Sequence, residues 1–210
     1  MIKFVIGLLL VCSVIYADAQ KIDELFIKMP ENMIVQLEEA WRKDLVELYK
    51  SGKTASLENT MQGRSTIQTM TDDYMLLQST ERSTVELKLL PLVNNTFIIC
   101  MIETVYAPVA DSRVSFYTIE WELLADENIF TPATEGLFLK DDADISLQDL
   151  LNVRSKLDMF LVKYSLSEED TSLIAEYTTP QYVSDEYKEN AKSLLKVDSK
   201  TFKWKSGRFE

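Results

Sequence analysis

Hydrophobic and polar residues alternate through the middle of the chain. Five segments share this period of two, namely 60–70, 73–80, 83–92, 95–106 and 113–124. Such alternation is typical of β-strands with one buried face. The breaks between the segments are short and polar, whereas a parallel crossover needs about a dozen residues or more. The pattern therefore predicts antiparallel strands joined as hairpins.

One of these segments is apolar on both faces. In 96–106, one side carries Phe97, Ile99 and Met101 and the other carries Ile98, Cys100 and Ile102. A strand that is apolar on both sides is covered on both sides. We therefore expect this strand to lie in the middle of its sheet, between two layers of the protein.

The period changes to that of a helix near residues 30–51. Apolar residues recur there at steps of three and four, as Ile34, Leu37, Trp41, Leu45 and Leu48. Pro30 suits a first helical turn and Gly52 a C-terminal cap. Glu38 and Arg42 are spaced as an ion pair on the solvent face. The pattern predicts one amphipathic helix across this range.

The C-terminal third predicts two further helices and three further strands. Ser146 with Asp149 forms a capping box before the segment 147–157, and Ser184 precedes a second helix that begins near Asp185. The strands are expected at 159–167, 172–179 and 200–209, the last as an edge-like strand. The fold class is therefore α+β: an antiparallel, hairpin-built sheet packed by an N-terminal helix and two later helices.

The first nineteen residues form a separate unit. A short basic start precedes the apolar run 4–15, which is too short to span a bilayer, and Ala17 and Ala19 give an A-x-A cleavage pattern. We predict a signal peptide at 1–19, cleaved after Ala19. The bulky Val11 before Cys12 favours this reading over a lipoprotein signal. Residues 20–210 then form a single domain, or two lobes with the second from about residue 146.

Composition excludes several chemistries. The chain has no histidine and a net charge of −12. Ser-His-Asp and Cys-His catalysis and His-ligated zinc are therefore excluded, and nucleic acid is an unfavourable partner. After signal cleavage Cys100 is the one cysteine left, so an internal disulfide cannot form. Its apolar surroundings in sequence indicate an inert core thiol. No cofactor motif is visible.

Two segments are candidate sites. The first is the Ala-Pro-Val-Ala-Asp-Ser stretch, whose Asp111 and Ser112 we interpret as turn-forming residues of a hairpin connection, and which could serve as a surface for a partner. The second is the acidic run 141–149, in which Asp142 and Asp144 alternate as in a calcium loop. The run lacks the Gly and Glu of an EF-hand, so a solvated loop is the preferred interpretation.

The order of several motifs resembles a known family. They are "MP" before the first helix, "WRKDLVELYKSGK", "LLP" at 89–91, "ETVYAPVADSRVSFYTIEW", "YSLS" at 164–167, "YTTPQYVSDE" and the terminal "KWKSGRF". They are similar to those of the exported family of Bacteroides-type bacteria described as domain of unknown function 3256. The resemblance implies a bacterial envelope protein. It brings no activity, substrate or site residue.

Two functional classes follow from the sequence. The first is a non-enzymatic envelope or periplasmic protein that binds a partner protein or a glycan. The second is a histidine-free hydrolase that uses paired carboxylates on a glycan or peptide. We favour the first because no nucleophile with a base is visible. A deep pocket with two facing carboxylates would favour the second.

Overall fold

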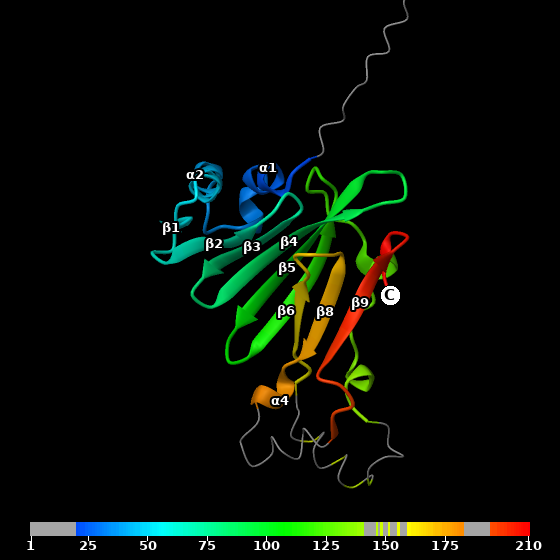
Figure 1. Cartoon of the computed structure of the whole chain (residues 1–210). Helices are drawn as coiled ribbons and strands as arrows, with labels where there is room; N and C mark the ends of the chain where they lie inside the picture. Colours follow the sequence, from blue (N-terminus) through cyan, green and yellow to red (C-terminus); the bar gives the residue numbers. More distant parts are fainter. Residues whose placement is uncertain are drawn as a thin grey trace, which may run out of the picture.

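The computed structural model describes residues 20–140, 146, 148, 151, 155, 159–182 and 194–210. The predicted antiparallel strands are confirmed, and they form two sheets (Figure 1). The first is a six-stranded meander in the order β1-β2-β3-β4-β5-β6. Its strands are β1 (Ser56–Glu58), β2 (Arg64–Met70), β3 (Tyr74–Thr80), β4 (Ser83–Pro91), β5 (Phe97–Tyr106) and β6 (Ala110–Tyr117).

The second sheet is built from the end of the chain. Its order is β10-β9-β8-β7, and all of its neighbouring strands are antiparallel. The strands are β7 (Val162–Leu166), β8 (Ser172–Tyr177), β9 (Ser199–Lys205) and β10 (Arg208–Phe209). The expected terminal strand at 200–209 is thus a hairpin, and β9 lies inside the sheet rather than at its edge. Gly207, with a φ of +86°, makes its turn.

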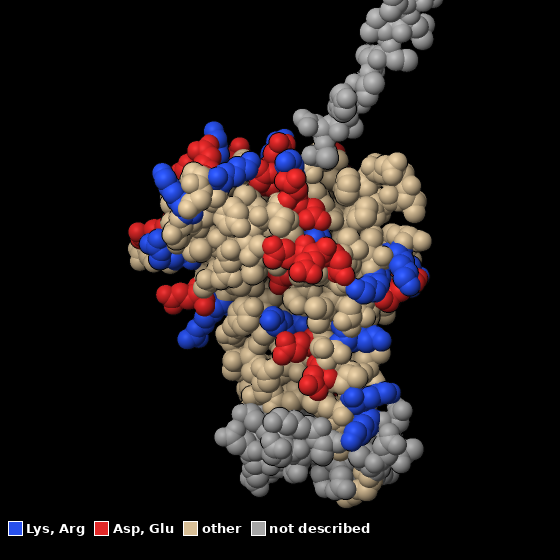
Figure 2. All heavy atoms as spheres, in the orientation of Figure 1, with Lys and Arg blue, Asp and Glu red and all other residues tan. Residues whose placement is uncertain are grey.

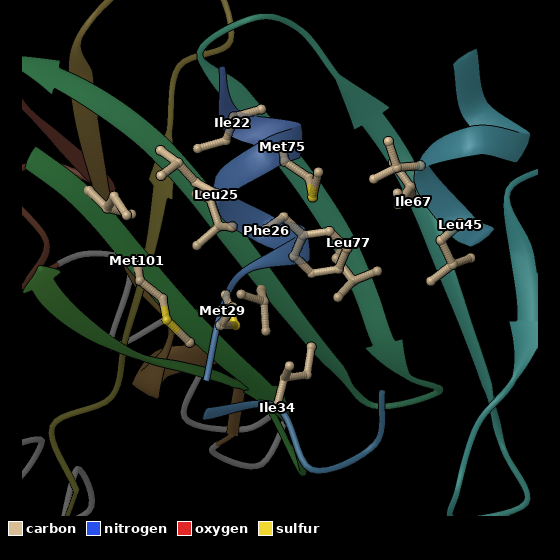
Figure 3. Packing of buried hydrophobic residues seen from close by; sticks show 14 of the residues in the cluster. Ile22, Leu25, Phe26, Met29, Ile34, Leu45, Ile67, Met75, Leu77 and Met101 are labelled. Atoms are coloured by element: carbon tan, nitrogen blue, oxygen red, sulfur yellow. The ribbon is translucent and has the colours of Figure 1, made fainter. Parts of the chain in front are cut away.

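Helices cover one face of the first sheet. They are α1 (Ile22–Ile27), the 3₁₀ turn η1 (Glu31–Met33) and α2 (Glu39–Lys50). Figure 3 shows Leu25 and Phe26 of α1 packed over Met75 and Leu77 of β3. Lys50 of α2 forms an ion pair with the buried carboxylate of Asp23, which ties the two helices together.

The predicted helix over 30–51 is wrong in its first part. Residues 34–38 are not helical, although Ile34 and Leu37 are buried as expected. The reason is Arg42, whose side chain is buried rather than on the solvent face. Its guanidinium donates hydrogen bonds to the backbone carbonyls of Ile27, Met29 and Leu37. These bonds supply the non-helical backbone with partners that a continuous helix would have provided itself.

The opposite face of the first sheet packs against the second sheet. This second core is rich in aromatic side chains, and Phe130 makes edge-to-face contacts with Tyr164 and Phe202. β5 lies between β4 and β6 and contributes to both cores, so the predicted central strand is confirmed. Short elements complete this region: η2 (Asp126–Asn128), η3 (Glu135–Leu137) and α4 (Thr179–Tyr182).

The strand predicted at 113–124 ends earlier than expected. β6 stops at Tyr117, and Trp121 adopts a φ of +66° as the chain turns back to bridge Tyr117 with Leu123. The indole of Trp121 is buried, and its Nε1 donates to the Leu25 carbonyl at 3.1 Å. The burial of this ring against α1 determines the backbone conformation at Trp121 and ends the strand. The alternation of apolar and polar residues gave no sign of this contact.

Several predictions fall outside the described residues. They are the signal peptide at 1–19, the acidic residues Asp142 and Asp144, most of the segment 147–157, and the helix expected from Asp185. Within the described ranges, no helix combines the length and the apolar character needed to cross a membrane.

Candidate functional site

The two candidate residues Asp111 and Ser112 are strand residues. The predicted hairpin is confirmed, because β5 and β6 pair from Tyr106 opposite Ala110 onward. The connection, however, is only residues 107–109, and it contains a cis Ala107-Pro108 bond. Asp111 and Ser112 are therefore the second and third residues of β6, and the turn-forming role that we expected for them is wrong. Their backbones pair with β5, and their side chains can contact another part of the protein.

These two side chains bind β7, the edge strand of the second sheet. Alternate backbone N–H groups of β7 each donate to a side chain of the first sheet. The bonds are Val162 N to Asp111 Oδ1 (3.2 Å), Tyr164 N to Ser112 Oγ (3.0 Å) and Leu166 N to Glu86 Oε2 (2.8 Å). We call Glu86, Asp111 and Ser112 the β7 latch. The latch gives both sequence candidates a structural role.

Glu86 belongs to a buried polar cluster between the sheets. The Tyr74 hydroxyl lies 3.4 Å from its Oε2. Burial is the main reason that the pKa of Glu86 is raised, while the bonds from Leu166 and Tyr74 oppose the rise. Burial, and then the nearby Glu86 charge, raise the pKa of Tyr74 far above its usual range. The Tyr74 hydroxyl therefore stays protonated near neutral pH, and the Glu86 carboxyl is held between the sheets by the bonds from Leu166 and Tyr74.

Lys88 is the third ionisable member of this cluster. Its side chain is 2% exposed, and Nζ lies 3.0 Å from Asp73 Oδ2 and 3.0 Å from the Glu168 carbonyl oxygen. The ammonium also lies 5.7 Å from the centre of the Tyr74 ring. A buried ammonium with these partners joins β4 to the β7–β8 turn. Sequence alternation placed Lys88 on a strand but gave no sign that it is buried.

A small groove lies on the helix-covered side, where the loop at 32–36 crosses the hairpin ends of the first sheet. We call it the hairpin groove, and its volume is about 270 Å³. Its lining comes from Asn32, Met33, Ile34, Val35, Gln36, Ser79, Ser83, Thr84, Val85, Glu103, Thr104 and Val105. Three segments far apart in sequence therefore meet at one hollow.

The walls of the hairpin groove combine apolar and polar groups. Val35 and Val105 are 57% and 53% exposed, which is high for valine side chains. The hydroxyls of Ser79 and Ser83 lie 2.8 Å apart and form a polar edge. Glu103 is the one charged residue of the lining. Such a mixture of apolar wall and few polar groups is typical of a ligand site.

The carboxylates that line another hollow do not form a glycosidase pair. Asp44 and Glu47 border a hollow beside α2, but both are exposed and lie one turn apart on the same helix. Side chains at that spacing stand next to each other, whereas glycoside hydrolysis needs carboxylates on either side of the bond. Among the residues that the structure describes, no group of three acidic or thiol side chains is arranged for a metal ion.

These features define a two-sheet α+β protein with a latched edge strand and a small groove. The chain belongs to the family described as Protein of unknown function (DUF3256), which matches residues 14–209. The resemblance read from the sequence is confirmed to this extent. In structure the chain is similar to a domain of an uncharacterized protein from Porphyromonas gingivalis W83, with 29% sequence identity and a TM-score of 0.78. The match covers 90% of this chain and 97% of that one. No curated protein matches the chain.

Proposed function

We propose that this protein is a non-enzymatic binding protein of the bacterial envelope and that it holds its partner at the hairpin groove. The observation that carries the proposal is the groove itself, with exposed valines beside polar groups and a single carboxylate. The buried ionisable groups of Glu86 and Lys88 are occupied in joining the two sheets. These two buried ionisable groups therefore have a structural role.

Sequence and similarity support the envelope location. Residues 1–19 have the basic start, apolar run and small-residue pattern of a cleaved signal peptide. The structurally similar domain comes from Porphyromonas gingivalis W83, which supports a bacterial source. We infer that the chain is released after cleavage behind Ala19. The intact mass of protein recovered from the envelope measures this, and a lipid-modified Cys12 terminus would contradict it.

Site-specific photocrosslinking tests the binding function. A photoreactive amino acid at Val105, on the groove rim, should give a discrete adduct in native envelopes. The matched control places the same group at Ile174, which is 36% exposed on the outer face of β8. An adduct from Val105 alone supports the proposal. Equal adducts from both positions, or none from Val105, would contradict it.

A further inference from the structure

The hairpin groove has a clear charge preference. Glu103 is its one charged lining residue, so no lysine or arginine of the lining can attract an anion. Arg113 lies opposite Glu103 on β6, yet the described residues show no ion pair to Glu103. A carboxylate that forms no ion pair at the edge of a hollow favours a cation. The net charge of −12 adds to this preference at longer range.

Figure 2 shows how charged side chains are distributed over one face of the molecule. On the face shown, acidic side chains gather in the area where Figure 1 places the turn between β7 and β8. That turn contains Glu168, Glu169 and Asp170. Lys and Arg side chains are dispersed over the same face and form no continuous basic patch. This acidic turn belongs to the second sheet, whereas the hairpin groove lies on the helix-covered side of the first sheet, so the charge preference of the groove itself rests on Glu103.

The volume of the groove and the chemistry of its walls restrict which ligands it can bind. A groove of about 270 Å³ lies below the range of about 300–1,000 Å³ that is typical of drug-sized ligands. One long side chain fits this volume better than an oligosaccharide does. Met33, Val35, Val85 and Val105 supply apolar wall for an aliphatic stem. The amides of Asn32 and Gln36, with Glu103, supply acceptors for a polar head.

We propose that the hairpin groove binds a lysine side chain of a partner protein, with the ammonium at Glu103 and the stem along Val35 and Val105. This proposal rests on the binding function proposed above and specifies its ligand chemistry. Lysine suits the site better than arginine because an ammonium directs three donors to separate acceptors. A guanidinium instead gains most from a bidentate carboxylate and a flat surface.

The test is an NMR titration of the isotope-labelled protein purified from the envelope. The probe is a capped pentapeptide, Gly-Ala-Lys-Ala-Gly, and its matched controls carry norleucine or arginine in place of the lysine. We expect the lysine peptide to shift the amide signals of groove residues such as Val35, Ser83 and Val105. Norleucine keeps the stem and lacks the charge, so that peptide should bind more weakly.

Two variants assign the effect to one carboxylate. Glu103→Gln should weaken lysine-peptide binding about fivefold, the upper end for an ion pair open to solvent. Glu81→Gln removes the same charge from the exposed β3–β4 turn, outside the groove lining. Binding to this control should match the wild type. Raising the salt concentration should weaken binding of the lysine peptide more than that of the norleucine peptide.

The outcomes separate this inference from the broader proposal. Equal binding of the lysine and norleucine peptides, stronger binding of the arginine peptide, or no loss with Glu103→Gln would overturn the lysine assignment. If crosslinking from Val105 still captures a discrete partner in that case, the binding function stands without the lysine. If the peptides give no groove shifts and Val105 gives no adduct, both proposals are wrong.

Discussion

Replacing Ser112 with alanine tests the β7 latch most directly. The Ser112 hydroxyl accepts a hydrogen bond from the Tyr164 backbone N–H at 3.0 Å and lies 2.8 Å from the Thr104 hydroxyl. Thr104 is 1% exposed, so water cannot readily replace the lost partner. The substitution therefore removes two hydrogen bonds and leaves two polar groups, the Tyr164 N–H and the Thr104 hydroxyl, without this partner between the sheets.

The expected cost follows from those two polar groups. Each buried polar group left without a partner costs about 1–3 kcal/mol. We expect Ser112→Ala to lower the free energy of unfolding by about 3 kcal/mol, whereas a turn hydroxyl would contribute about 1 kcal/mol. A double variant, Ser112→Ala with Thr104→Val, should recover about 1 kcal/mol because the second substitution removes one of the two polar groups left without a partner.

Equilibrium urea denaturation measures these differences. The matched control is Ser165→Ala on β7, because the Ser165 hydroxyl has no hydrogen bond among the described residues and alternation turns it to the other face of the sheet. Its effect should stay within about 0.5 kcal/mol. A cost below about 1 kcal/mol for Ser112→Ala, or no recovery in the double variant, would refute the latch.

Three further predictions concern single side chains. Thr84→Val should raise the free energy of unfolding by about 1 kcal/mol, because the Thr84 hydroxyl is buried without a partner among the described residues. Thr104→Val, at the cross-strand neighbour, should lower the free energy of unfolding because it removes the bond to Ser112. Urea denaturation of both variants measures the two effects. Folding raises the pKa of Glu86 above its ordinary value of 4.5, so its stabilising contribution is present below pH 4.5 and is lost as the pH rises through the folded-state pKa. Glu86→Gln should therefore gain stability relative to the wild type as the pH rises from 4.5, and a pH-independent difference in urea midpoints would contradict this. Gly52→Ala should cost about 1 kcal/mol, because Gly52 follows α2 with a φ of +71°, and an unchanged thermal midpoint would show the site to be unstrained.

The strands could be predicted because their information is local. Alternation along 60–117 reports which side of each strand is buried, and short breaks fix the antiparallel order. The helix boundary at Glu39 could not be predicted in this way. Ile34 and Leu37 keep helical spacing, but buried hydrogen bonds from Arg42 stabilise a different backbone there. A charged residue in an amphipathic pattern is normally assigned to solvent, so this signal was misleading.

The latch and the hairpin groove could not be predicted because they depend on contacts between distant segments. Ser112 meets Tyr164 across 52 positions of sequence, and no local pattern reports that meeting. The groove joins the loop at 32–36 to the ends of β3, β4 and β5. The one sequence signal for these sites was indirect. Asp111 and Ser112 are polar residues that directly precede a predicted strand, and polar side chains that become buried need partners.

The β7 latch also determines how this protein meets its own copies. An edge strand usually presents unpaired N–H and C=O groups, which act as a template for another chain and so lead to aggregation. β7 is the edge of the second sheet, but its outward N–H groups at 162, 164 and 166 are already bound. The edge strands β1 and β10 are short, with three and two residues. The fourth edge strand, β6, has eight residues, and its carbonyls at Ala110 and Phe116 accept hydrogen bonds from Thr178 and Leu124. Concentrated copies of the folded chain should therefore not polymerise through β7.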